Sequence, residues 1–322
     1  MIPLGMNRGG RAAKWKPRDR KGPRQRRRAL EGYLYLLPWI VGFLAFYATP
    51  ILISLAMSFT KYSVLAPPVF VGLENYKFAL FGDELGVSSF VRSFQYAALA
   101  VPLGLAGSLL LAMALNQGLH LNTLWRTCHY LPTLMPGAAA AILWLWLLNP
   151  QVGVVNYLLS LVGIVGPAWF FDPGWAIPSV VMVALFGSVG GATMIIFLAG
   201  LQSVPQELLD SAEIDGAGRF AKFRYVTVPM ISPMLFFNLV VGIIASLNVF
   251  DTAWIATKGG PANATWFISL QIYVSAFRNF EMGYASALAW LLTLVVFVLT
   301  FIQFRLSGHW VFYQGGGRED VR

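Results

Sequence analysis

The chain has 322 residues, of which 57% are hydrophobic and only 11% are charged. A soluble domain carries roughly 25% charged residues, so this composition excludes an ordinary soluble enzyme and an intrinsically disordered chain. It indicates a protein that crosses a membrane several times. The single cysteine, Cys128, excludes an intramolecular disulfide and a cysteine-cluster metal site, and no metal site is expected.

The formal net charge of +9 is concentrated near the N-terminus, where eleven of the 23 Lys and Arg residues lie between Arg8 and Arg28. We interpret residues 1–30 as an unstructured basic arm that fixes topology and touches anionic lipid. Nucleic-acid binding is not expected, because the arm has no aromatic-interleaved fold and leads directly into an apolar run. It is not a cleavable signal peptide, since that run is too long and no small-residue cleavage site follows it.

Six apolar runs are long enough to cross the hydrocarbon core as helices, which takes about 20 residues each. In chain order they are about Tyr33–Phe59, Tyr96–Asn116, Leu131–Leu148, Ile177–Leu201, Met234–Ala256 and Tyr284–Phe304. We therefore expect an all-α membrane protein with six transmembrane helices over residues 31–313, followed by a short tail, 314–322.

The distribution of Lys and Arg sets the orientation of these spans. With the basic arm in the cytoplasm, both termini and the loops after the second and fourth spans lie inside. Those inner segments then hold 18 of the 23 basic residues, and the outer loops hold five. We therefore expect both termini to be cytoplasmic.

Residues 202–233 form a polar loop between the fourth and fifth runs. Ser203 is expected to cap a short helix over about Pro205–Glu213, and Gly216 to supply the bend after it. A second short helix is expected over about Ala217–Arg224. One face of the first helix carries three acidic residues at i, i+3 and i+6, which are Glu207, Asp210 and Glu213. Helices this short do not fold alone, so the loop is expected to fit a groove on a partner.

This loop resembles the EAA loop of ABC importer permeases. The resemblance rests on Asp210-Ser-Ala212, on Asp215-Gly216-Ala217, on the aromatic residues Phe220 and Phe223, and on Val226-Thr-Val-Pro229. Asp210 stands where the family pattern has Glu, and Ser211 where it has Ala. The resemblance implies that the loop couples the permease to an ATPase, through residues that include Glu207, Asp210, Ala212, Glu213, Asp215, Gly216, Ala217, Phe220 and Phe223.

A second block resembles the carbohydrate branch of this family, of the maltose type, in the subunit that resembles maltose permease F. It comprises Asn248-Val-Phe-Asp251, Thr257-Lys-Gly-Gly-Pro261 and Thr265, followed by Phe277, Gly283-Tyr-Ala-Ser-Ala287 and Trp310-Val-Phe-Tyr313. The resemblance covers roughly residues 30–313. It implies six transmembrane helices with a cytoplasmic two-helix coupling loop between helices 4 and 5, in the inner membrane of a bacterium.

The resemblance also implies partners. These are a second permease subunit, two ATP-binding subunits, an extracytoplasmic solute-binding protein and a sugar that this protein delivers. The chain itself is expected to bind no cofactor and to have no catalytic residue, with ATP and Mg held by the separate ATPase. Gly216-x-Gly218-x-x-Ala221 imitates a dinucleotide fingerprint, but no buried strand precedes it, so it does not indicate a nucleotide site.

Candidate residues of the substrate path come from the fourth and fifth runs, because polar groups in a membrane are costly unless they face protein or water. On a continuous fifth helix, Asn238, Asn248 and Thr252 would lie within an arc of about 80°. The other candidates are small, hydroxyl-bearing or aromatic: Ser188, Gly191, Thr193, Ser246 and Phe250. Ordinary helix packing through small residues is the competing interpretation.

Other substrates and another class of protein stay open at this point. Glycerol-phosphate would favour cations in the path and polyamines would favour several acids, but the six runs hold no Lys or Arg and only one acid, Asp251. This pattern favours a neutral di- or oligosaccharide, and an anionic oligosaccharide remains open if the binding protein selects it. A channel or secondary transporter is the alternative class, and the chain shows neither its buried acids in several spans nor an inverted repeat.

Overall fold

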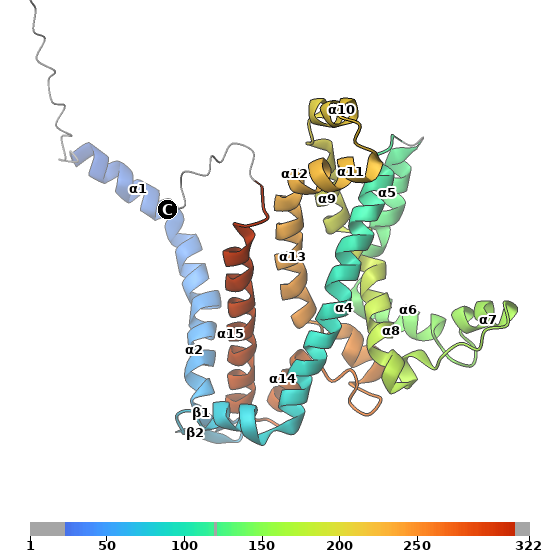
Figure 1. Ribbon diagram of the computed structural model, residues 1–322. Coiled ribbons are helices and arrows are strands. Elements are labelled where there is room, and N and C mark those ends of the chain that lie inside the picture. The colour runs from blue at the N-terminus through green and yellow to red at the C-terminus, as the bar shows by residue number, and fades with distance from the viewer. Residues whose placement is uncertain (1–22, 119–120, 313–322) are drawn as a thin grey trace, which may run out of the picture. The chain divides into compact units, whose positions relative to one another are not determined.

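The computed structural model describes residues 23–118 and 121–312 (Figure 1). The first part of the basic arm, the tail 314–322 and Tyr313 lie outside the described residues. The described chain divides into two units, one ending at Ile53 and the other beginning at Ser54. Each unit is described by itself.

The first unit is helical. α1 (Pro23–Phe43) continues through the π-helical turn η1 (Leu44–Ala48) into α2 (Thr49–Ser58). The apolar part, Gly32–Ser58, is long enough to cross a membrane, in agreement with the first predicted span. α1 begins inside the stretch interpreted as an unstructured arm, so residues 23–30 are helical and that interpretation is wrong for them.

The second unit begins with the end of α2, Ser54–Ser58, and a small antiparallel hairpin that the sequence did not predict follows. β1 (Thr60–Ser63) pairs with β2 (Ala66–Phe70), with Thr60 opposite Phe70. Two short turns, α3 (Glu74–Lys77) and η2 (Phe78–Gly82), lead into α4 (Glu84–Leu115). α4 packs against five other α-helices, and it is the central helix of this unit.

The third predicted span, Leu131–Leu148, is not one helix. It covers the turn η3 (Leu131–Leu134) and α6 (Gly137–Leu147), and α6 is bent by 97° from η3 and from the helix before it, α5 (Asn122–Tyr130), which the prediction left out of the span. α7 (Val154–Leu161) and the turn η4 (Trp169–Phe171) follow. Met135, which precedes Pro136, has an extended ψ of 128° and ends the turn η3.

The fourth span is also two helices, α8 (Pro173–Ser188) and α9 (Ala192–Gln202), which meet at 53°. α8 begins where it does because the carboxylate of Asp172 accepts hydrogen bonds from the backbone N–H groups of Gly174 and Trp175, at 2.7 and 3.2 Å. Pro173 is suited to the first helical position.

The remaining helices complete the bundle. After the loop helices come α13 (Ser232–Leu247), the π-helical turn η6 (Ala253–Thr257), α14 (Ile268–Phe277) and α15 (Met282–Ser307). Among the described residues, three helices and three bent pairs are long and apolar enough to make six spans. The prediction of a helical membrane fold with six spans is thus confirmed, with the hairpin and α14 as additions.

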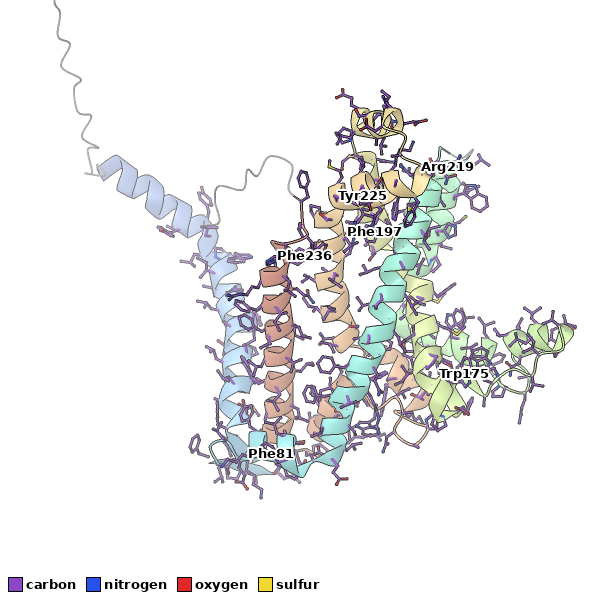
Figure 2. The ribbon with its side chains drawn as sticks, in the orientation of Figure 1. Phe81, Trp175, Phe197, Arg219, Tyr225 and Phe236 are labelled. Atoms are coloured by element: carbon purple, nitrogen blue, oxygen red, sulfur yellow. The ribbon has the colours of Figure 1, made fainter. Side chains whose placement is uncertain are left out.

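The loop between the fourth and fifth spans and the β-hairpin lie at opposite ends of the second unit (Figure 1). Figure 2 shows Arg219 and Tyr225 at the loop end and Phe81 at the other end. A buried cluster from α4, α9 and the start of α13 lies toward the loop end, and it consists of Ala112, Leu115, Met194, Phe197, Leu198, Leu201 and Ile231. The loop therefore lies next to a well-packed cluster of buried side chains.

Candidate functional site

The loop 202–233, called the coupling loop below, begins with α10 (Gln206–Ile214). Ser203 does not cap this helix as predicted, because its hydroxyl donates to the carbonyl of Gly200 at 2.7 Å and Pro205 occupies the N-cap position. The hydroxyl completes the preceding turn of α9, which leaves Pro205 to set the start of α10.

Gly216 ends α10 as predicted, with a φ of +81°. Its N–H donates to the carbonyl of Glu213 at 3.0 Å, and the N–H of Ala217 donates to the carbonyl of Ala212 at 2.9 Å. This pair of bonds is a Schellman motif, which needs a left-handed residue at the position of Gly216. The direction of the chain after α10 therefore depends on this glycine.

The second loop helix is longer than predicted. α11 (Arg219–Lys222), the π-helical turn η5 (Phe223–Thr227) and α12 (Val228–Met230) form one helical segment that ends at a 68° bend into α13. The predicted end at Arg224 is wrong, because the ring of Pro229 lies within the first turn of α12, where a missing N–H costs little.

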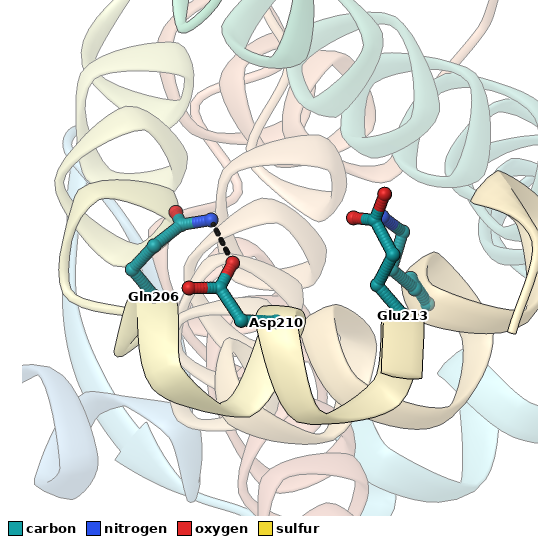
Figure 3. A network of polar contacts seen from close by, with 4 residues as sticks. Gln206, Asp210 and Glu213 are labelled. Atoms are coloured by element: carbon teal, nitrogen blue, oxygen red, sulfur yellow. Dashed lines mark hydrogen bonds and ion pairs between the residues drawn. The ribbon is translucent and has the colours of Figure 1, made fainter. Parts of the chain in front are cut away.

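Two polar contacts form within the loop, and Figure 3 shows the one between Gln206 and Asp210. The side chain of Gln206 donates to the carboxylate of Asp210 at 2.9 Å within α10. Lys222 of α11 forms an ion pair with Glu213 of α10 at 2.8 Å. Two of the three acids on the predicted face are thus bound within the loop, and Glu207 is exposed without such a contact among the described residues.

The coupling loop exposes large apolar side chains at the end of the bundle. Four stand out: Leu208 at 43% exposure, Ile214 at 87%, Phe220 at 79% and Tyr225 at 75%. Of the other predicted coupling residues, Asp215 is exposed, and Ala212, Ala217 and Phe223 are half-buried. A patch of this kind outside the spans is typical of a protein contact surface.

Four predicted path residues come together around one cavity of about 270 Å³ between α4, α8, α9 and α13. They are Ser188, Thr193, Asn238 and Ser246. Asn238 is 4% exposed, and its Nδ2 has no hydrogen-bond acceptor among the described residues. A buried amide donor without a partner is costly, so it is available to a ligand or water in this central cavity.

Gly191 lies instead at the break between α8 and α9, where the hydroxyl of Thr133 donates to the carbonyl of Gly187 at 3.0 Å. A Cβ on the neighbouring Gly190 would lie 1.9 Å from the carbonyl oxygen of His129. Only glycine allows this approach, so the break of the fourth span touches the backbone of α5 in the third span.

The other path residues do not share the central cavity. α13 ends at Leu247, so Thr252 is not on it, and the predicted arc of Asn238, Asn248 and Thr252 on one helix is wrong. The amide of Asn248 donates to the carbonyl of Ile244 at 2.7 Å and lines a separate cavity of about 450 Å³ beside α14 and α15. Phe250 packs in an aromatic cluster with Trp254 and Tyr273.

α4 supplies cavity residues that the sequence analysis missed. Tyr96, Ala100, Gly104 and Ser108 line the central cavity, and the hydroxyl of Ser108 donates to the carbonyl of Ser188 at 3.4 Å. A signal for them existed, because the last three are small residues at a spacing of four, which puts them on one helix face suited to close packing.

Several known proteins are similar to this chain. The probable ABC transporter permease protein YesP of Bacillus subtilis is 38% identical over 289 residues, which cover 88% of this chain and 93% of that protein. The sn-glycerol-3-phosphate transport system permease protein UgpA of Yersinia pestis is 36% identical, with 76% and 82% covered.

Solved structures resemble the fold as well. A chain in the crystal structure of a bacterial ABC transporter involved in the import of the acidic polysaccharide alginate is 26% identical, with a TM-score of 0.77, and covers 88% of this chain. The alginate ABC transporter in complex with an alginate pentasaccharide-bound periplasmic protein gives a TM-score of 0.78 at 26% identity, with 89% of this chain and 97% of that chain covered.

The family model described as "binding-protein-dependent transport system inner membrane component" matches residues 100–310, which include the coupling loop and the helices around the central cavity. The prediction of an ABC importer permease made from the loop motif is confirmed. This chain belongs to the family of binding-protein-dependent inner-membrane permeases of ABC importers.

Proposed function

We propose that this chain is the non-catalytic membrane subunit of a bacterial carbohydrate importer driven by a separate ATPase. The complex would contain a second permease subunit, two ATP-binding subunits that hold ATP and Mg, and an extracytoplasmic binding protein that delivers the sugar. The family description, and the solved importer that carries a periplasmic binding protein, support this composition. The excess of basic residues supports cytoplasmic termini.

The coupling loop is the docking element for the ATPase in this proposal. Its exposed apolar residues Ile214, Phe220 and Tyr225 would fill a groove on the ATPase, with Glu207 and Asp215 at the polar rim. ATP binding would close the ATPase pair and displace both loop helices together, because the ion pair between Lys222 and Glu213 joins them. The displacement would then favour one of the two access states of the spans.

The single observation that supports a sugar as the substrate is the chemistry of the residues that line the central cavity. Its lining offers hydroxyl groups, one free amide and the ring of Tyr96, and none of the lining residues is charged. Sugars bind through hydroxyls, amides and aromatic faces, whereas a phosphate ligand favours Arg or Lys. The cavity therefore supports a neutral di- or oligosaccharide, while the relative UgpA keeps glycerol-phosphate as the second candidate.

A panel of loaded binding proteins tests this proposal. The assembled complex in lipid nanodiscs is mixed with binding protein carrying a neutral oligosaccharide, an acidic oligosaccharide, sn-glycerol-3-phosphate or a polyamine, and ATP hydrolysis is measured. The proposal expects the largest stimulation with the neutral oligosaccharide. Stimulation by glycerol-phosphate alone would contradict the substrate class, and ATP hydrolysis that no loaded binding protein stimulates would contradict the whole assignment.

A further inference from the structure

The junction between the coupling loop and the fifth span is a break between two prolines. α12 ends at Met230 and α13 begins at Ser232, with Pro229 and Pro233 on either side. A helix would satisfy the carbonyl of Pro229 with the N–H four residues later, but that residue is Pro233 and has no N–H. The hydroxyl of Ser232 donates to this carbonyl, at 2.6 Å, beside a backbone N–H at the end of α12.

The same hydroxyl joins a third segment. α15 ends at Ser307, and the residues that follow turn back, with the N–H of Val311 donating to the carbonyl of Ser307 at 2.8 Å. The N–H of Phe312 then donates to the Ser232 hydroxyl at 2.8 Å. Ser232 is only 2% exposed, so these bonds are shielded from competing water. We call Gly308–Phe312 the C-terminal strap.

An aromatic contact accompanies this polar contact on the same face of α13. Phe236 lies one turn after Ser232 and is 6% exposed, near the loop end of the unit in Figure 2. Its ring packs edge-on against Trp310 of the strap, with centroids 6.0 Å apart, and against Phe304 of α15, at 5.0 Å. The strap thus holds both the break and the first turn of α13.

We propose that Ser232 is a positioning residue for energy coupling, through which the C-terminal strap fixes the break between the coupling loop and α13. A helix break flanked by two prolines is a place where a helix bends, because Pro233 cannot donate the backbone hydrogen bond that would continue the helix across it. When the contacts of Ser232 and Phe236 with the strap hold the break at a fixed angle, a displacement of the loop moves α13 as well. Without these contacts, the angle of the break changes when the loop moves, and α13 stays in place. This inference rests on the proposed coupling function of the loop.

The experiment measures sugar transported per ATP hydrolysed by the assembled complex in proteoliposomes. Ser232→Ala keeps ATP hydrolysis and lowers this ratio about fivefold, the effect of one buried hydrogen bond of ordinary strength. Ser232→Thr, which keeps the hydroxyl, restores the ratio. Trp310→Ala, at a half-exposed site of the strap, lowers it without removing a buried group from the break.

Ser307→Ala is the matched control, because its hydroxyl bonds only to the carbonyl of Phe304 in its own helix, at 2.7 Å. It leaves the ratio unchanged. A wild-type ratio in both Ser232→Ala and Trp310→Ala overturns the role of the strap. Gly216→Pro in the same assay separates the role of the coupling loop from the role of the strap. If Gly216→Pro alone lowers the ratio, the loop couples and the strap does not. If no variant lowers the ratio, both proposals fail.

Discussion

Replacing Gly216 tests the coupling loop most directly, because the structure isolates a single cause for the effect. No heavy atom lies within 4 Å of a Cβ built on this residue, so a side chain there meets no steric clash. What remains is the backbone conformation, since φ is +81° and L-residues rarely adopt it. The substitutions can therefore be ranked by their tolerance of the left-handed region alone.

The free-energy cost of each substitution at Gly216 follows from that ranking. Asn tolerates the left-handed region and is expected to behave nearly as Gly. Ala costs about 1 kcal/mol, a factor of about five. Pro holds φ near −65° and removes the N–H that donates to Glu213, so the cost is at least about 3 kcal/mol, or more than a hundredfold in the population of the native bend.

The assay is recovery of the ATPase with the tagged permease from solubilised membranes, together with ATP hydrolysis stimulated by loaded binding protein. We expect recovery in the order Gly and Asn, then Ala, then Pro, with loading of the binding protein unchanged. Ala212→Trp, which enlarges a half-buried position of α10, is expected to detach the ATPase as well. Wild-type recovery of the ATPase with both Gly216→Pro and Ala212→Trp would refute the coupling loop as the docking site. The basic N-terminal arm would then be the next candidate for the docking site.

Three further predictions address topology, the cavity and the loop ion pair. Cysteines placed at Gly10 and Asp215 in a chain without Cys128 should be protected from impermeant thiol reagents in intact cells, while one at Ala262 should label; labelling at position 215 would contradict the orientation. Asn238→Ala should lower uptake at limiting sugar about tenfold while assembly is unchanged, because it removes a free amide donor from the cavity; unchanged uptake would make Asn238 a packing residue. Lys222→Ala should change the stability of the complex by less than about 1 kcal/mol in thermal melts, since the side chain of its partner is 71% exposed; a much larger loss would mean that the ion pair is part of a docked interface.

The sequence predicted the elements that a single local signal defines. The first and last spans are uninterrupted apolar runs, and the helices Gly32–Ser58 and Met282–Ser307 match them. Gly216 was expected at a bend because few other residues accept a left-handed conformation, and the bend is there. The family motif of the loop begins on α10, continues through the bend at Gly216 and α11, and ends in η5 and α12, where short-range rules placed two short helices.

Hydropathy did not locate the breaks inside spans. The third run was expected to begin at Leu131, because α5 before it carries Arg126 and His129, although the pair of segments bent by 97° begins at Asn122. α13 ends at Leu247, but Val249 and Phe250 continue the apolar run beyond it. Asn248 was therefore placed on the face of a helix that had already ended.

The central cavity depends on which helices are neighbours, and this is a property of the whole fold. Ser188 and Asn238 belong to the two spans that were expected to line the path, but Ser108 belongs to a third helix. Periodicity assigns a face to each helix, and it does not say which other helix that face meets. Only the spacing of small residues on α4 hinted at a close neighbour.

The contact between Gly190 and His129 has a consequence for how the spans can move. Where side chains separate two helices, one can slide along the other as rotamers readjust. Here the backbone of Gly190 meets the carbonyl oxygen of His129 with no room for a Cβ, so no side chain of Gly190 keeps the two helices apart at this point. Sliding of the third and fourth spans past each other would bring backbone atoms into collision here, which favours rotation about the crossing.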